Sequence, residues 1–116
     1  MSRRPDGLTY VFDLDGTLCD TPGTDYARAV PKRRRIEQVQ KLARQGHTIK
    51  IETARGSVTG VTGALLKLTH DQLKQWRVPV RELRLGRKPV GDVYVDDKGV
   101  NDRVFFKDGK PPEGLR

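Results

Sequence analysis

The chain has little cysteine, few aromatic residues and no long apolar run. Of its 116 residues, one is cysteine and 6% are aromatic. Because Cys19 has no second cysteine to pair with, an internal disulfide framework is excluded, and we expect a reducing, cytoplasmic location. No apolar stretch approaches the roughly 20 residues of a membrane span, and residues 1–7 lack the apolar core of a signal peptide. We therefore expect no membrane partner.

Acidic residues are scarce relative to basic ones. The chain has 23 Lys and Arg against 15 Asp and Glu, which gives a formal net charge of +8. A positive surface is typical of proteins that bind nucleic acid or another polyanion, and it also attracts phosphorylated small molecules. The densest basic run, Lys32–Arg35, lies where a helix begins, an unfavourable end for cations. We interpret this run as a solvated helix face, with substrate attraction and nucleic-acid contact as alternatives.

The length of the chain predicts a single domain over residues 1–116. No internal repeat and no linker divides it. We expect residues 1–7 and 110–116 to be flexible ends.

Apolar segments alternate with amphipathic ones along the chain. Strands are predicted at residues 8–12, 48–53, 82–85 and 93–95, with a further edge strand at 104–106. Helices are predicted around residues 36–43 and 65–76. Pro31 suits the first turn of the earlier helix, and Thr69 is expected to cap the second part of a later helix split at that point. This alternation predicts a Rossmann-like α/β three-layer sandwich with a mainly parallel sheet.

Several other polar or aromatic side chains are expected to be structural. His47 begins a strand at the end opposite the acidic residues, while Tyr26 and Trp76 are interpreted as packing groups. Asn101 is expected to cap the turn that follows it. Cys19 lies close to the acidic loop, but no histidine stands near it in sequence to activate the thiol, so we interpret it as a bystander.

Acidic and hydroxyl side chains follow three of the predicted strands. Asp13 and Asp15 follow the first strand, Thr53 ends the second, and Asp96 and Asp97 close the strand at 93–95. The carboxyl ends of parallel strands share one edge of a sheet, so these residues should converge there. Paired carboxylates repel unless a cation or a proton lies between them, and Mg²⁺ is a hard ion that such carboxylates bind. An aspartate can also act as a covalent nucleophile. The alternative to a metal or catalytic site is that Asp13 and Asp15 only form an acidic turn after the strand.

At these residues the chain resembles the haloacid dehalogenase (HAD) superfamily of phosphatases. The family's four motifs match, in order, Asp13–Thr17, Thr53 within Ile51–Gly56, Lys88 within Gly86–Pro89, and the pair Asp96 and Asp97. The resemblance implies a HAD-like core. Because the intervals after the first two motifs are short, it also implies a member without a cap domain.

Within that superfamily the chain is similar to the small capsule-biosynthesis phosphatases and related cap-less members. The shared features are Tyr26–Pro31, Gly46–His47 and Asp96–Lys98. Those relatives often carry Gly-Lys-Pro directly, whereas here Arg87 precedes the lysine, a departure that leaves the substrate open.

The resemblance implies a role for each catalytic side chain. Asp13 would attack phosphorus and become an aspartyl-phosphate, while Asp15 would protonate the leaving oxygen and then deprotonate the attacking water. Thr53 would donate a hydrogen bond to a phosphoryl oxygen. Lys88 would offset the charge of the transferring group.

The resemblance also implies a metal site and a substrate site. Mg²⁺ would be held by Asp13, by the backbone carbonyl of Asp15 and by the closing pair, with Asp97 as the direct ligand and Asp96 as the residue tethering the lysine or a metal-bound water. Substrate would contact Thr53 and Lys88, joined by Ala54. From its place beside Thr53, Arg55 is expected either to bind the phosphate or a sugar carboxylate of the substrate or to stabilise its own loop.

The sequence thus predicts a Mg²⁺-dependent phosphomonoester hydrolase acting on a sugar phosphate or a polysaccharide-precursor phosphate. An open site without a cap could be covered by a second copy of the chain, so a homo-oligomer is one expectation. Two alternatives stay open. One is a polynucleotide 3′-phosphatase, favoured by the positive charge, and the other is a non-catalytic polyanion-binding module with the same fold.

Overall fold

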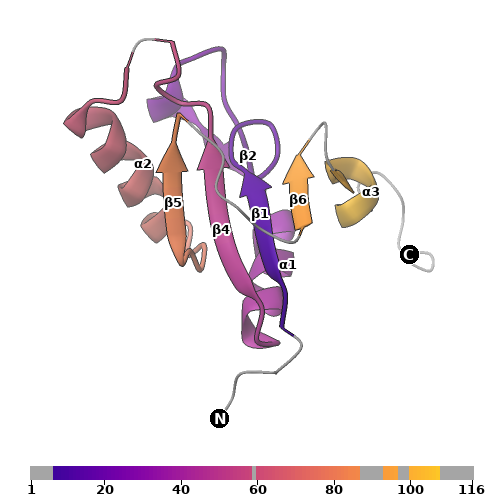
Figure 1. Cartoon of the computed structure of the whole chain (residues 1–116). Helices are drawn as coiled ribbons and strands as arrows, with labels where there is room; N and C mark the ends of the chain where they lie inside the picture. Colours follow the sequence, from indigo (N-terminus) through magenta and orange to yellow (C-terminus); the bar gives the residue numbers. More distant parts are fainter. Residues whose placement is uncertain (1–6, 59, 87–92, 97–99, 108–116) are drawn as a thin grey trace.

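The computed structural model describes residues 7–58, 60–86, 93–96 and 100–107, with the backbone alone at 94, 96 and 100. Its main feature is a five-stranded sheet in the order β5-β4-β1-β6-β7 (Figure 1). The strands are β1 (Thr9–Asp13), β4 (Thr48–Thr53), β5 (Glu82–Leu85), β6 (Val93–Asp96) and β7 (Val100–Asn101). Every pair in this sheet is parallel. The predicted α/β architecture with a parallel sheet is confirmed.

Two long helices connect the strands on one side of the sheet. Helices α1 (Arg33–Arg44) and α2 (Gly63–Gln75) lie behind the sheet in Figure 1. Strand β4 lies next to β1 and β5 lies next to β4, in the same direction across the sheet. Right-handed crossovers between these parallel strands therefore place both helices on one face. Ile36 and Val39 of α1 are fully buried at helical spacing. The short α3 (Asp102–Phe106) lies beside the β6 edge.

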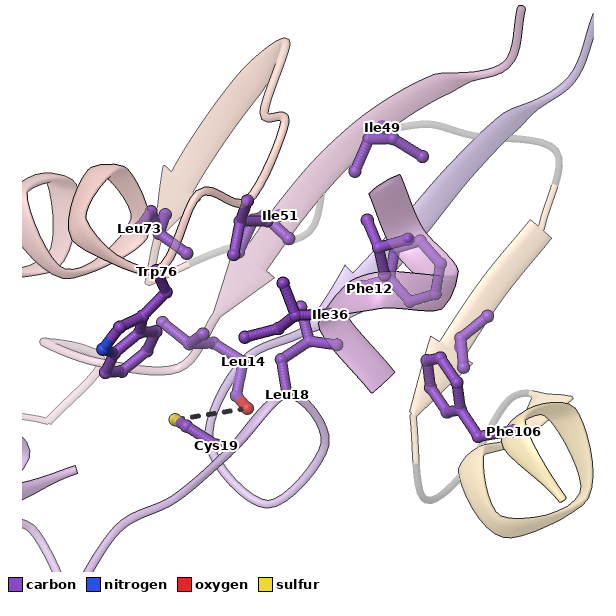
Figure 2. Packing of buried hydrophobic residues seen from close by; sticks show 13 residues of the cluster. Phe12, Leu14, Leu18, Cys19, Ile36, Ile49, Ile51, Leu73, Trp76 and Phe106 are labelled. Atoms are coloured by element: carbon purple, nitrogen blue, oxygen red, sulfur yellow. Dashed lines mark hydrogen bonds between the residues drawn. The ribbon is translucent and has the colours of Figure 1, made fainter. Parts of the chain in front are cut away.

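The core lies between the sheet and these helices. Figure 2 shows Phe12 and Ile51 of the sheet facing Ile36 of α1, with Trp76 packed at the far end of the cluster. Phe106 of α3 closes the other end, with its ring centroid 5.9 Å from that of Phe12. The interpretation of Trp76 as a packing group is confirmed, since it is 5% exposed.

The segment between β1 and α1 forms a small flap. It contains β2 (Cys19–Asp20), the 3-10 helix η1 (Tyr26–Arg28) and β3 (Val30–Pro31), and β2 pairs with β3 in an antiparallel ladder. This interval therefore holds a hairpin rather than a cap domain. Pro31 belongs to β3, so its predicted place in the first helical turn is wrong, and α1 begins two residues later.

The predicted edge strand at 104–106 is wrong, because these residues belong to α3. The Asn101 side chain accepts hydrogen bonds from the backbone N–H groups of Arg103 and Val104, which confirms it as a cap and starts a helix there. Phe106 is buried, whereas Val104 is 70% exposed. A run of three apolar residues fits a strand and a helical turn equally well, and the cap decides between them.

The predicted break of α2 at Thr69 is also wrong. The Thr69 hydroxyl donates to the carbonyl of Leu65, one turn earlier, and the helix continues through it. Thr62 is the actual cap, since its hydroxyl accepts the N–H of Leu65 at 3.1 Å. Thr69 is instead fully buried within the helix.

The basic run at the start of α1 is only partly a solvated face. Arg33 and Arg34 are exposed, but Arg35 is buried and forms an ion pair with Asp102 at 2.8 Å. The same Nη1 atom donates to the carbonyl of Thr17 at 2.8 Å. Arg35 therefore ties α1 to α3 and to the loop after β1, which contradicts the solvated interpretation at this residue.

His47 lies at the amino end of β4, away from the acidic loop. Its Nδ1 accepts the backbone N–H of Leu8, and its ring meets that of Tyr10 edge-on at 5.3 Å. Both contacts agree with the structural role expected for His47.

Among the helices described, none has the length and apolar character needed to cross a membrane.

Candidate active site

The loop after β1 is a single tight turn that leaves two carboxylates at the sheet's carboxyl edge. The carbonyl of Leu14 accepts the N–H groups of Thr17 and Leu18 at 3.1 and 2.8 Å. Leu14 and Leu18 are fully buried, so they anchor the turn in the core. Gly16 has a φ of +85°, a left-handed conformation that favours glycine at this position.

Asp13 ends β1 at the centre of the sheet. The Thr17 hydroxyl donates to Asp13 Oδ2 at 3.4 Å, across the turn. Asp13 lies opposite Glu52 in the β1–β4 register, one residue before Thr53. The first acid and the strand-ending hydroxyl thus lie on neighbouring strands at the same edge.

Asp15 is held by side chains from three segments of the chain. Arg55 donates to it with two nitrogens, Nη2 to Oδ1 at 2.8 Å and Nε to Oδ2 at 2.9 Å. The Thr21 hydroxyl, from the flap, donates to Oδ1 at 2.6 Å. The Thr53 hydroxyl donates to Oδ2 at 3.3 Å. The predicted convergence of Asp15 and Thr53 is confirmed.

These contacts decide the charge of Asp15. Burial disfavours the carboxylate, but the hydrogen bonds from Arg55 and Thr21 outweigh it and hold the pKa of Asp15 below its ordinary value. The side chain of Asp15 is nevertheless 25% exposed. It is therefore an ionised carboxylate with one side open to solvent.

Arg55 is a charged residue of the site that is almost fully buried, at 1% exposure. Besides Asp15, its Nη1 donates to the hydroxyl of Thr69 at 3.1 Å and to Oε1 of Gln72 at 2.7 Å. Its guanidinium also lies 4.5 Å from the ring centroid of Tyr26. A guanidinium enclosed in this way is occupied by protein partners, so the geometry favours contact with Asp15 over the substrate contact expected from the sequence.

Tyr26 connects the flap to the same network. Its ring covers Arg55, and its backbone carbonyl accepts Nε2 of Gln72 at 2.6 Å. Arg55, Gln72 and Tyr26 come from the β4–α2 loop, from α2 and from η1. The flap is therefore anchored to the same residues that surround Asp15.

Cys19 lies close to Asp15 but is poorly suited to chemistry. Its Sγ lies 3.6 Å from Asp15 Oδ1, and it also donates to the carbonyl of Leu14, the contact drawn as a dashed line in Figure 2. Burial raises the pKa of the Cys19 thiol to about 11. Because the thiolate is the reactive form, the expected bystander role agrees with this environment.

The other predicted site residues are described only in part. Ala54 is exposed directly after Thr53. Asp96 is the last residue of β6. The residue before it, Val95, pairs with Phe12, so β6 and β1 end at the same level of the sheet.

Lys88 and Asp97 lie outside the described residues. Leu85, the last residue of β5, pairs with Thr53, three positions before the lysine.

The described residues include no cluster of three or more His, Cys, Asp or Glu side chains that could hold a metal ion. Asp15 Oδ1 and Oδ2 both accept hydrogen bonds from protein donors. A metal contact from Asp15 would therefore use its backbone carbonyl, as expected from the sequence, and not its carboxylate.

Three partners of the site were not predicted: Thr21, Thr69 and Gln72. Nothing in the local sequence singles out Thr21. For the other two a signal exists, since Thr69 stands four residues before Leu73 and Gln72 stands four residues before Trp76, on the apolar face of the helix. Polar side chains on a buried helix face need partners, which here are supplied by Arg55.

Comparison with known proteins supports the fold and names no activity. No protein-family model and no curated protein matches this chain. A crystal structure of a protein from Vibrio cholerae, described only as an MCSG target, is 29% identical in sequence. The match covers 91% of each chain with a TM-score of 0.67. The α/β architecture is thus shared along nearly the whole chain.

Proposed function

We propose that this protein is a cytoplasmic, Mg²⁺-dependent phosphomonoester hydrolase that works through an aspartyl-phosphate on Asp13. Its substrate would be a small phosphorylated molecule, a sugar phosphate or a polysaccharide-precursor phosphate. The observation that carries the proposal is the meeting of Asp15 and Thr53 beside Asp13 at one edge of the sheet. Phosphoryl transfer depends mainly on such positioning and on electrostatic stabilisation.

The proposed reaction has two steps. In the first, a carboxylate oxygen of Asp13 forms a bond to phosphorus and the bond from phosphorus to the ester oxygen breaks. The leaving oxygen takes a proton from Asp15, which is ionised before substrate binds and must first accept that proton from the phosphate monoanion of the substrate. In the second, water attacks the same phosphorus, the bond to Asp13 breaks, and Asp15 takes the proton from that water. The products are the free alcohol and inorganic phosphate.

Thr53 and Lys88 would bind the transferring group. Thr53 has one hydroxyl hydrogen, which now points to Asp15 Oδ2 at the long distance of 3.3 Å. With substrate bound, that hydrogen would be donated to a phosphoryl oxygen instead. Lys88 follows β5, the neighbour of β4, and would supply positive charge from that side.

The donor set suits a hard divalent cation, because it offers oxygen ligands only. The carboxylate of Asp13, the carbonyl of Asp15 and the acids Asp96 and Asp97 would hold Mg²⁺, which usually binds one or two carboxylates together with phosphate oxygens. When bound, the ion would neutralise charge on the phosphoryl group. The nucleophilic attack and the proton transfers are carried out by Asp13 and Asp15.

Metal removal provides the first test. We expect the purified protein to release phosphate from 4-nitrophenyl phosphate and from a panel of hexose and heptose phosphates in the presence of Mg²⁺. EDTA should abolish this activity because the phosphoryl charge then loses its divalent counter-ion, and excess Mg²⁺ should restore it. Phosphate release would be measured before and after dialysis against the chelator. Activity that is unchanged after chelation would contradict the proposed metal dependence.

A polynucleotide 3′-phosphatase is the second candidate, favoured by the net charge of +8 and by exposed cations on α1, namely Arg33, Arg34, Lys41 and Arg44. Binding of a polynucleotide releases counter-ions, so its affinity falls steeply with salt. Turnover of a 3′-phosphorylated oligonucleotide with a steep salt dependence, and no turnover of sugar phosphates, would select this candidate. Binding of oligonucleotide without any turnover would instead select the non-catalytic module.

The predicted homo-oligomer remains a prediction. An open site would gain shielding from water if a second copy covered it. Sedimentation of the protein with and without substrate would measure the assembly state.

A further inference from the structure

We infer that Arg55 is a positioning residue that holds the Asp15 carboxylate in place for hydrolysis of the phosphoenzyme, an inference that rests on the proposed function. The two nitrogens that Arg55 directs at Asp15 reach different carboxylate oxygens, at 2.8 and 2.9 Å. A planar fork of this kind fixes the plane of a carboxylate as well as its position. A lysine, with a single point charge, fixes neither.

Arg55 is itself held from the opposite side. Thr69 and Gln72 accept its Nη1, and the Tyr26 ring lies against its guanidinium. Because its side chain has no exposed surface, it is not placed to touch substrate, and among its described partners Asp15 is the one with a proposed role in the reaction. A side chain whose own rotamer is locked by packing and hydrogen bonds holds its partner more tightly than a mobile one.

The remaining contacts of Asp15 explain how it could still take a proton. Oδ1 accepts from Arg55 and Thr21, and Oδ2 accepts from Arg55 and, more weakly, from Thr53. A carboxylate oxygen has about two acceptor positions. When the Thr53 hydroxyl turns to a phosphoryl oxygen, Oδ2 regains one position. Arg55 then keeps Asp15 oriented while that position takes the proton of the attacking water.

The two-step reaction allows this role to be separated from a purely structural one. With 4-nitrophenyl phosphate the leaving group needs no proton, so Asp13 can be phosphorylated without help from Asp15. Water attack on the phosphoenzyme still needs the base. Loss of the positioning contact should therefore slow the second step alone.

We expect Arg55→Lys to lower kcat for 4-nitrophenyl phosphate by about 10²-fold, within the range of general-base effects. KM should fall by a similar factor, so that kcat/KM stays within about threefold of the wild type. Acid-quenched samples should show more phosphoenzyme at steady state than the wild type. A variant that is only partly folded would instead lose kcat and kcat/KM together at unchanged KM.

A second variant covers the case in which Arg55→Lys does not fold. Gln72→Met keeps the volume of the side chain but removes one acceptor from Arg55, and it should give the same pattern with a smaller fall of about fivefold in kcat. Arg84→Lys is the matched control, since Arg84 pairs with Glu82 on β5. It should leave kcat and KM unchanged.

The outcomes separate this inference from the function on which it rests. A wild-type protein that does not hydrolyse 4-nitrophenyl phosphate would overturn the proposed function. An active wild type in which Arg55→Lys and Gln72→Met change nothing, or lower kcat at constant KM, would overturn the positioning role alone.

Discussion

Asp13→Asn is expected to lower phosphatase activity by about 10⁴-fold or more, the order of loss seen when a catalytic nucleophile is removed. The side-chain amide has nearly the same shape as the carboxylate, but its oxygen is a far weaker nucleophile. The Thr17 hydroxyl can still donate to that oxygen, as it donates to Oδ2 now. Phosphate release would be followed with 4-nitrophenyl phosphate, and thermal unfolding should show that the fold is kept.

Asp20→Asn is a suitable control for the first prediction. Asp20 lies on β2, is largely exposed and approaches Lys32 at 3.6 Å. Its replacement changes the charge of the protein by the same amount outside the proposed chemistry, so activity should stay close to that of the wild type. Activity retained by Asp13→Asn would refute the nucleophile assignment.

Asp102→Ala is expected to destabilise the protein by about 3–5 kcal/mol, because it leaves the buried Arg35 without its carboxylate. The two side chains are 5% and 13% exposed and are joined at 2.8 Å. Arg35 also donates to the Thr17 carbonyl, so the loss should loosen both α3 and the loop that carries Asp13. Chemical denaturation of the wild type and the variant would measure the free energy of unfolding.

Two comparisons test the cause of that loss. Adding Arg35→Met to Asp102→Ala removes the unpaired charge and should recover part of the stability. Asp71→Ala removes an exposed partner of Lys67 on α2 and should barely move the unfolding midpoint. If Asp102→Ala unfolds at the same denaturant concentration as the wild type, the buried pair does not hold α3 in place.

The strands were predictable because their apolar residues lie in short runs with distinct ends. The bounds of β4 and β5 agree with the prediction to the residue. The error at residues 104–106 arose because a three-residue apolar run carries no period, so only the Asn101 cap decides its structure. The error at Pro31 arose because a proline suits an edge strand as well as a helix start.

The site was predictable as far as it follows from strand ends. Asp15 and Thr53 follow neighbouring parallel strands, so topology alone brings them to one edge. The role of Arg55 depends on how α2 rotates about its axis and on where the flap crosses the site. These are tertiary features, so they could not be predicted from the residues next to Thr53 in the sequence.

Identification of the phosphorylated residue tests the central claim most directly. The protein would be mixed with a substrate that carries a radiolabelled phosphoryl group, quenched in acid and digested, and the labelled peptide would be sequenced. The account predicts label on Asp13, sensitive to hydroxylamine as an acyl phosphate is, and absent from Asp13→Asn. Turnover of the substrate with no trapped label, or with label on any other side chain, would contradict it.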